Sequence, residues 1–511
     1  MALHRNIYWA DGCASGALSR ADASRSTRKT RCAHVNTDQT RREQDFLGER
    51  AIPADALWGV HTSRALENFP ISGTSIARHR ELVAALGSVK LAAARANAEL
   101  GLLDERRLGA IESACGEVIK GLLDDQFVVD VVQGGAGTST NMNANEVIAN
   151  RALQVLGLQP GDHAEIHPND HVNASQSTND VYPTAVKIAL LHGLDNLAGA
   201  VRTLSEAFAA KGEEFRAVPK VGRTQLQDAV PMTVGQEFSA WAATLAEEQA
   251  RILDSRGLLS EINLGATAIG TGITADPRYA SVVLRHLREI TGMPLQTAGD
   301  LVEATADTGV FVQLSGVLKR TAVKVSKICN DLRLLSSGPQ AGLGELRLPP
   351  RQAGSSIMPG KVNPVVPEVV NQVAFWVVGN DVTITMAAEA GQLQLNAFEP
   401  IMCHGLLQSM DWMARAFDTL ARLCVRDIEV NAAHLEQVSA HSVGVVTALL
   451  PHLGYAEASA IAKAALSGEG DVRSLVLRTG TLDEARLDEL LDPERLAGVK
   501  ATAAVGEEAM D

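Results

Sequence analysis

The sequence predicts a mainly α-helical protein in which the longest helices form one central bundle. Aromatic residues make up only 4% of the 511 residues and hydrophobic residues 46%, so Ala, Leu and Val must fill the core. Ala and Leu enter helices at little cost, whereas sandwiches and barrels favour aromatic and β-branched residues. Apolar residues recur three or four positions apart over long stretches, and no stretch alternates apolar and polar residues with comparable strength.

The first 44 residues differ from the rest and are predicted to form a disordered extension. They are rich in Arg, Ser, Ala and Thr and have no sustained apolar period. Such a segment buries too little surface to offset the entropy lost on ordering. A transit peptide has a similar composition, but Asp11, Asp22 and Asp38 and the lack of an amphipathic face argue against one. A start codon assigned too far upstream would give the same pattern.

Seven ranges after this extension have the apolar spacing of helices. Thr233 and Gln236, a hydroxyl and an amide three residues apart, have the form of a capping box that opens one of them. Several of the helices reach roughly 40 Å, which is expected where neighbours cover each helix along its length. The predicted helices span residues 78–103, 104–123, 181–215, 233–258, 300–336, 364–390 and 406–430.

Charge and cysteine usage exclude several classes of protein. The net charge of -14 argues against nucleic-acid binding, which needs a basic face. No run of about 18 apolar residues is present, so we expect no membrane span. The six cysteines include no Cys-x-x-Cys pair and fit neither a disulfide framework nor a zinc ribbon. We therefore expect a cytoplasmic protein with scattered buried thiols.

Four polar stretches interrupt the helical pattern, and all are dense in hydroxyls, amides and glycines. They span residues 134–143, 175–180, 222–228 and 354–364. The first two fit an anion site beside a helix N-terminus, but helix capping alone would explain the same residues. The third, taken singly, resembles a solvated turn.

The fourth stretch, GSSIMPGKVNP, carries the most information. Asn363 is a good N-cap and Pro364 a good first helical residue, so Lys361 is expected just before a helix N-terminus. A lysine beside the positive end of a helix dipole forms an anion clamp. The glycines at 354 and 360 permit a mobile lid over a substrate.

Three other motifs fail on spacing or context. The stretch from Gly354 to Lys361 has one residue too many for a phosphate loop. The three histidines at 163, 167 and 171 would form a metal-binding face only on a helix, which Pro168-Asn169-Asp170 interrupts, so solvated or capping histidines are expected. The glycine-rich residues 265–272 do not follow a strand, so they do not indicate dinucleotide binding.

These four stretches together resemble the aspartase/fumarase superfamily, in the family's order, and the resemblance runs from about residue 42 to the end. Within the superfamily the chain is most similar to aspartate ammonia-lyases. The similarity lies in LWGVHTSRALENF at 57–69, in Gln225 after Thr224, and in PVVPEVVNQV at 364–373. Class II fumarate hydratase, which acts on fumarate and L-malate, is the alternative, and a non-catalytic helical scaffold is a third hypothesis.

The resemblance implies a homotetramer with a shared helical core, in which loops of three subunits build each active site. It also implies three domains, placed at 45–177, 178–433 and 434–511. It implies a small dicarboxylate substrate and no cofactor required for the chemistry, while activation by Mg²⁺ stays open.

The family's motifs assign roles residue by residue. Ser355 corresponds to the general base. Lys361 and Asn363 would hold the α-carboxylate with Thr224 close by, and Asn179 and Gln225 would face the amino group. No catalytic role is assigned to Glu368, because fumarases pair this position with a His that is absent here. The β-carboxylate would be held by Thr138, Ser177, Thr178 and Ser356.

The chemistry agrees with these assignments. Removing a C3 proton from aspartate gives a dianionic enediolate, which needs many fixed donors and few titrating groups. A serine acts as a base only as its alkoxide, so loop N–H groups and a cation must lower its pKa. Departing ammonium already carries its proton, so the carbonyl of Gln225 can accept a hydrogen bond from it without titrating.

Overall fold

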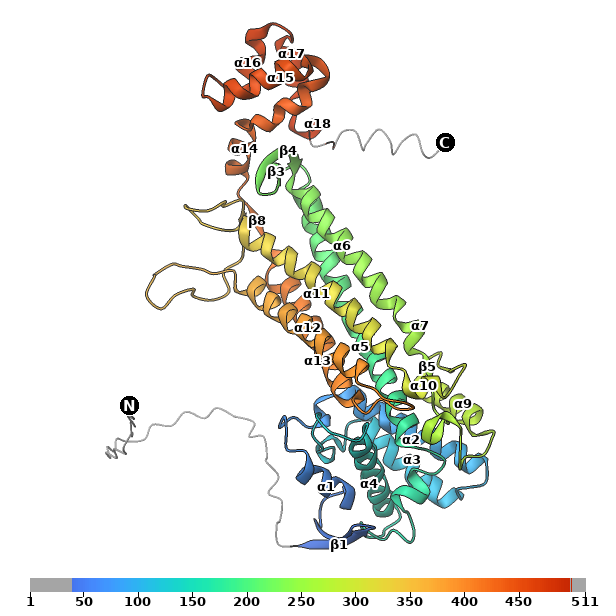
Figure 1. The fold of residues 1–511 in the computed structure, drawn as a ribbon. Helices are drawn as coiled ribbons and strands as arrows, with labels where there is room; N and C mark the ends of the chain where they lie inside the picture. Colours follow the sequence, from blue (N-terminus) through green and yellow to red (C-terminus); the bar gives the residue numbers. More distant parts are fainter. Residues whose placement is uncertain (1–38, 497, 499–511) are drawn as a thin grey trace, which may run out of the picture. The chain divides into compact units, whose positions relative to one another are not determined.

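The computed structural model describes residues 39–496 and 498, and the account below concerns residue 40 onward. The predicted all-α class is confirmed: helices dominate, and strands occur in two-stranded pairs only within the part of the chain that is described. Five long helices form the bundle, each packed against at least two others (Figure 1). They are α5 (Thr178–Glu214), α6 (Val234–Asp254), α11 (Gly309–Leu335), α12 (Val365–Glu389) and α13 (Glu399–Leu423).

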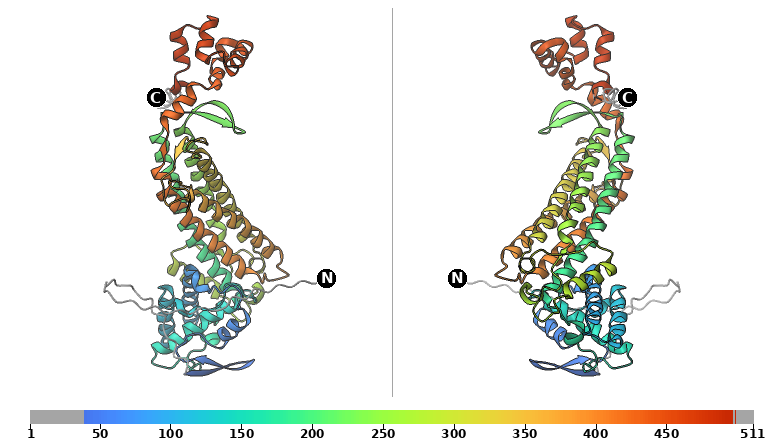
Figure 2. Two further views of the ribbon diagram at one scale, coloured as in Figure 1. Left: turned by 90° about the vertical axis from the view of Figure 1, so that its left-hand side faces the viewer. Right: turned by 90° about the vertical axis from the view of Figure 1, so that its right-hand side faces the viewer.

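Helix α5 is the axis of the bundle, and its 37 residues span about 55 Å. It begins with a capping box in which Ser177 accepts from the Asn179 N–H and Asp180 accepts from the Ser177 N–H. At its other end, α5 leads into a hairpin of β3 (Pro219–Thr224) and β4 (Gln227–Thr233), which projects beyond α5 and α6 (Figure 2). The predicted capping box of Thr233 and Gln236 then opens α6.

The predicted helices largely match the structure. The prediction for 406–430 was shifted: α13 begins at Glu399 and ends at Leu423, because Asn396 and Pro400 start it earlier than the apolar spacing indicated. The range 300–336 is divided into a short α10 (Glu303–Ala306) and α11. Helix α4 (Thr138–Val155) was missed, since its first turns consist of the hydroxyls and amides predicted as a polar loop.

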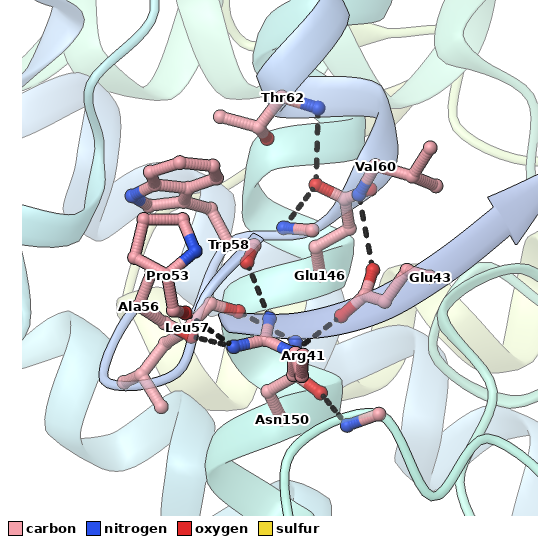
Figure 3. Close-up of polar contacts among 12 residues, drawn as sticks. Arg41, Glu43, Pro53, Ala56, Leu57, Trp58, Val60, Thr62, Glu146 and Asn150 are labelled. Carbon is pink, nitrogen blue, oxygen red and sulfur yellow. Dashed lines mark hydrogen bonds and ion pairs between the residues drawn. The ribbon is translucent and has the colours of Figure 1, made fainter. Parts of the chain in front are cut away.

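The amino-terminal part packs α2, α3 and α4 on one another, and α2 and α4 also pack on α5. A buried polar network ties it to the first strands (Figure 3). Glu146 of α4 accepts from the N–H groups of Gly59, His61 and Thr62, and its burial raises the pKa of this carboxyl to about 7. Arg41 donates to Glu43 and to three backbone carbonyls. The elements of the amino-terminal part, besides α4, are β1 (Thr40–Asp45), β2 (Gly48–Pro53), α1 (Val60–Asn68), η1 (Ile76–Arg78), α2 (Arg80–Glu99), α3 (Glu105–Ile119), η2 (Asp124–Gln126) and η3 (Pro168–Val172).

Strand β1 corrects the boundary of the predicted extension. Residues 40–44 pair with β2 in register, because Arg41 finds carbonyl and carboxylate partners that a composition argument cannot see. The rest of the predicted extension, residues 1–38, lies outside the described residues.

Short elements connect the bundle to its surroundings. They are α7 (Arg256–Leu259), β5 (Glu261–Ile262), α8 (Thr267–Gly270), α9 (Tyr279–Thr291), β6 (Gln296–Thr297), β7 (Leu346–Arg347), η4 (Val425–Asp427) and β8 (Glu429–Val430). Strands β7 and β8 pair antiparallel, so the segment that follows α11 is joined to the segment that follows α13. Cys115, Cys329, Cys403 and Cys424 are free buried thiols, as expected; Cys13 and Cys32 are not among the described residues.

The carboxy-terminal helices have a hydrophobic core of their own. One stretch, Val443–Leu466, is long and apolar enough to cross a membrane by length and composition alone, although we expected none. Gly454 adopts φ 74° inside it, so it is not one regular helix, and Leu453 and Ile461 pack in this core. The elements are α14 (Ala432–Ala440), η5 (Val443–Leu449), α15 (Leu450–Leu466), α16 (Val472–Thr479), α17 (Glu484–Leu490) and α18 (Pro493–Leu496).

Candidate active site

The first group of predicted residues lies where α4 and α5 begin. Thr138 opens α4, and Ser177, Thr178 and Asn179 open α5. The two helix starts are in close contact, because a Cβ on Gly137 would lie 2.4 Å from the Tyr182 ring of α5. The structure therefore brings four of the predicted substrate-binding residues together at two helix N-termini, where free N–H groups favour an anion. We call this group the amino-terminal cluster.

A buried lysine supports this cluster from behind. Lys90 of α2 is 0% exposed, and its Nζ donates to Asn173 Oδ1 and Gln176 Oε1, both at 2.9 Å. Asn141 of α4 then donates to Asn173 Oδ1 and to Thr178 Oγ1. Burial lowers the pKa of Lys90 to about 7. Sequence reasoning missed Lys90, although a lysine inside the apolar run GSVKLAAA was a visible signal.

The hydroxyls of the cluster differ in their freedom to bind a ligand. Thr178 Oγ1 and Ser177 Oγ accept hydrogen bonds from within the protein, so each keeps its own proton for a carboxylate. Thr138 instead donates to the Gly135 carbonyl at 2.7 Å and must rotate to reach a ligand. Asn179 donates through Nδ2 to the Ala268 carbonyl, which leaves its Oδ1 to face a cation.

The glycine-rich residues 265–272 contact the start of α5 behind this cluster. The Gly265 N–H donates to Asp180, and Asn263 donates to the Asn179 carbonyl. Asp180 is 0% exposed, and burial raises the pKa of its carboxyl to about 6. This loop therefore fixes the start of α5, a role that its spacing did not predict.

The second group is the flap, residues 352–362, which leads into α12. Ser355 is half-buried, and its Oγ accepts from the Ile357 and Met358 N–H groups at 3.2 and 3.0 Å. Two N–H donors stabilise an alkoxide more than a neutral hydroxyl, so they favour deprotonation of this serine. Ser356 and Lys361 are exposed on the same loop.

Asn363 and Pro364 do not cap α12 in the predicted way. The helix begins at Val365 with Pro364 as its N-cap, and no side chain caps it. The Asn363 amide donates instead to the Gly354 carbonyl at 2.9 Å, beside a bond from Gly354 N–H to the Lys361 carbonyl. Asn363 therefore closes the base of the flap, because the chain returns on itself between Gly354 and Lys361.

The third group is the tip of the β3–β4 hairpin. Thr224 pairs with Gln227, and Gln225 and Leu226 form the turn with φ of 55° and 63°. Two consecutive positive φ angles are the geometry of a two-residue hairpin turn. Thr224 and Gln225 are exposed.

A single chain does not assemble these three groups. The amino-terminal cluster opens α5, whereas the hairpin follows the other end of this helix, about 55 Å away (Figure 1). The flap is also remote from the cluster. Thr305 beside α11 contacts Asn263 near the cluster, and the 27 residues of α11 then extend for about 40 Å toward the flap. The elements on either side of the flap are held there: Arg351, just before it, donates to the Leu423 carbonyl, and Arg333 of α11 donates to Asn371 of α12.

The histidines at 167 and 171 have capping roles, as expected. His167 accepts from the N–H groups of Asn169 and Asp170, and His171 accepts from the His167 N–H. Pro168–Val172 forms one π-helical turn where an interruption was predicted. Within residues 39–496 and 498, no group of three or more His, Cys, Asp or Glu side chains is placed to hold a metal ion.

Two family models match the chain. The model described as "Lyase" matches residues 48–379, and the model described as "Fumarase C C-terminus" matches residues 445–498. The first covers more than half of the chain and includes all three groups of predicted site residues.

Curated relatives match over most of their length. An aspartate ammonia-lyase from Pseudomonas canavaninivorans is 55% identical over 89% of this chain and 96% of that protein. An enzyme of the same name from Escherichia coli K12 is 51% identical over 90% of this chain and 96% of that protein.

Solved structures share the fold. Fumarate lyase:delta crystallin from Brucella melitensis bound to cobalt has a TM-score of 0.88 and 57% identity, and covers 90% of this chain and 100% of its own. A class II fumarase from Schistosoma mansoni has a TM-score of 0.85 and 32% identity, and covers 90% of this chain and 99% of its own.

Proposed function

The chain belongs to the aspartase/fumarase superfamily of lyases, and on this premise we propose that it is a carbon–nitrogen lyase that deaminates L-aspartate reversibly to fumarate and ammonia. The observation that carries the proposal is Ser355, whose Oγ receives two backbone N–H groups on an exposed flap. That is the environment a serine base requires, since its alkoxide must be stabilised before it can remove a proton.

Gln225 favours deamination over hydration. A departing hydroxide must be protonated, so a hydratase gains from a titrating histidine at this turn. A protonated amino group leaves as neutral ammonia and needs no further proton, so a glutamine carbonyl can hold this group through a hydrogen bond without titrating. Relatives named aspartate ammonia-lyase at 51–55% identity agree with this choice.

In the proposed reaction, the Ser355 alkoxide removes the C3 proton next to the β-carboxylate. The electrons move into that carboxylate and form an enediolate. Ser177 and Thr178 would donate to its oxygens at the amino-terminal cluster, together with Thr138 and Ser356. The enediolate then collapses, the C2–N bond of the protonated amino group breaks, and neutral ammonia departs beside Asn179 and Gln225. The C3 proton stays on Ser355 Oγ until it is released to solvent, where ammonia is protonated to ammonium. Lys361 and Asn363 would hold the α-carboxylate, with Thr224 nearby.

The site requires more than one chain. Because the cluster and the hairpin lie about 55 Å apart at opposite ends of α5, loops of neighbouring subunits must complete each site. We propose a homotetramer in which three subunits contribute one group each. Exposed apolar residues of α12, such as Phe375 at 65% and Met386 at 67%, supply a surface for this packing.

Further parts of the proposal follow from the chemistry. All the groups assigned to the reaction are protein side chains and N–H groups, so we propose that no cofactor is required, and that Mg²⁺ acts, if at all, as an activator. The buried free thiols agree with a cytoplasmic location.

One assay separates the candidate activities. The full-length protein is given L-aspartate and L-malate separately while the absorbance of fumarate is followed. We expect fumarate from aspartate. Release from malate alone would assign the hydratase activity instead, and no release from either acid would support a non-catalytic scaffold.

A further inference from the structure

We propose that Glu345 is a positioning residue that fixes the hairpin bearing Thr224 and Gln225 to the root of the flap bearing Ser355. Its carboxylate contacts Lys220 Nζ at 3.1 Å and Arg223 Nη1 at 2.5 Å, and both partners lie on β3. The inference rests on the proposed function, because it concerns how two of the proposed substrate-binding groups are placed.

The cluster around Glu345 is buried and balanced in charge. Glu345 and Lys220 are each 2% exposed. Lys220 also pairs with Glu237 of α6 at 2.7 Å, so two carboxylates face two cations. Interactions between buried charges are screened little by solvent, and their geometry is strongly specified. The hairpin is thereby fixed in direction at its base.

Arg223 carries this constraint to the tip of the hairpin. It directly precedes Thr224. In the backbone register of the hairpin, Arg223 lies opposite Asp228 of β4, just after a register shift between Val221 and Arg223. The turn residues that follow are exposed. Among the described ion pairs, the one between Arg223 and Glu345 is the nearest in sequence to Thr224 and Gln225.

The backbone of Glu345 belongs to the root of the flap. Its N–H donates to the Leu335 carbonyl at the end of α11, and its carbonyl accepts from the Asn431 N–H. The next two residues form β7, paired with β8, and Ser355 follows ten residues after Glu345. Glu345 thus contacts the hairpin through its side chain and belongs to the root of the flap through its backbone, and the proposed reaction uses both segments.

In the proposed tetramer, the hairpin and the flap of one chain serve different active sites. Glu345 would then act on two sites at once: on the binding of the amino group in one and on the base in another. A residue that only stabilised the fold would not shift the substrate affinity of a neighbouring site.

The first test compares four variants of the full-length tetramer. We expect Glu345→Gln and Arg223→Gln to raise the KM for aspartate by about tenfold, with a smaller change in kcat, because the mispositioned tip weakens substrate binding. Glu345→Asp should restore part of the affinity. Glu237→Gln is the matched comparison: it removes one carboxylate from Lys220 but leaves the pair of Arg223 with Glu345 in place, so it should raise KM clearly less than Glu345→Gln or Arg223→Gln does.

Amide hydrogen exchange provides a readout that does not depend on turnover. In Glu345→Gln and Arg223→Gln, exchange in residues 219–228 should become faster, while residues 173–180 of the amino-terminal cluster stay unchanged. If Glu345→Gln fails to assemble, Arg223→Gln carries the test, because its side chain is 19% exposed and less deeply buried. Unchanged KM and unchanged exchange in Arg223→Gln would overturn the proposal even if the wild-type protein deaminates aspartate.

A hybrid tetramer tests whether Glu345 of one chain affects substrate binding in a second active site. Chains carrying both Ser355→Ala and Glu345→Gln are co-assembled with wild-type chains, so only sites that use a wild-type flap turn over. We expect a raised KM in these sites, because some receive their hairpin from a substituted chain. A wild-type KM in the hybrids, beside a raised KM in the Glu345→Gln tetramer, would contradict the action on a second site. Absence of aspartate turnover by the wild-type protein would refute the proposed function, and the exchange measurement would still decide the role of Glu345.

Discussion

The amino-terminal cluster and the flap carry the two halves of the proposed site, and they are built in opposite ways. Around the cluster, Lys90, Asn141 and Asp180 are buried and hydrogen-bonded, so Ser177 and Thr178 are held in place before a ligand binds. The flap is exposed over most of its length, and the bonds at its base run between Gly354, Lys361 and Asn363. In the proposed reaction, the buried cluster would be a preorganised platform for the developing charge, and the exposed flap would supply the base.

The largest expected effect follows from the flap. Ser355→Ala removes the proposed base while the platform stays intact, so kcat should fall by about 10²- to 10⁴-fold. The variant should still bind a non-reactive dicarboxylate such as succinate. Stopped-flow and calorimetric measurements on the same preparation check both parts. Turnover within about twofold of the wild type would remove Ser355 as the base.

A substitution in the platform should act through stability. Lys90→Met removes a buried donor from Gln176 Oε1 and Asn173 Oδ1, and an acceptor left unsatisfied costs about 1–3 kcal/mol. Turnover should fall as well, because Asn173 orients Asn141 and thereby Thr178. Thermal unfolding at fixed protein concentration measures the first effect. Unchanged unfolding and turnover would show that the network does not support the cluster.

The stability lost in Lys90→Met should depend on pH in a definite direction. Burial lowers the pKa of Lys90 to about 7 from 10.5. Between these values the unfolded chain binds more protons than the folded chain, so the contribution of Lys90 to stability increases with pH. The wild-type advantage over Lys90→Met should therefore grow by roughly 2 kcal/mol from pH 7 to pH 9. An advantage that stays constant over this range would place the folded pKa near the ordinary one.

Lys361→Ala changes another side chain of the exposed flap, and its expected effect on turnover is smaller than that of Ser355→Ala. Loss of one charge-assisted bond to the α-carboxylate should raise the KM for aspartate by about 10- to 100-fold. Because Lys361 is exposed, the midpoint of thermal unfolding should not change. Aspartate saturation equal to that of the wild type would remove the carboxylate-binding role of Lys361.

The smallest expected effect concerns the hairpin. A Cβ on Gly444 would lie 2.0 Å from the Ala229 carbonyl oxygen, so Gly444→Ala must displace β4. We expect the KM for aspartate to rise by about two- to fivefold, as the hairpin tip shifts. Gly257→Ala is the control, because a Cβ there has nothing within 4 Å. Equal kinetics in the two variants would show that the carboxy-terminal helices do not position the hairpin.

The sequence predicted the long helices better than the contacts that surround them, and its assignment of the site residues stays a prediction. Apolar spacing located α5 and α6, and the capping box of Thr233 and Gln236 marked the start of α6, since these signals are local. Helix α4 was missed because its first turns carry Thr, Asn and Ser, which are common in caps and loops. Lys90 and Glu345 were missed because their partners are far away in sequence, at Asn173 and on β3. Asn363 was assigned to a cap that it does not form, as the flap uses its amide instead.

One measurement tests most directly the claim that separate chains complete each site. Chains with Ser355→Ala and chains with Thr178→Val are co-expressed with different tags, and hybrid tetramers are isolated through both tags. Each parent tetramer lacks one group in every site. If different chains supply residue 355 and residue 178, some hybrid sites contain both groups, and the hybrids should deaminate aspartate far faster than either parent. Hybrid activity equal to the average of the parents would mean that one chain supplies both groups.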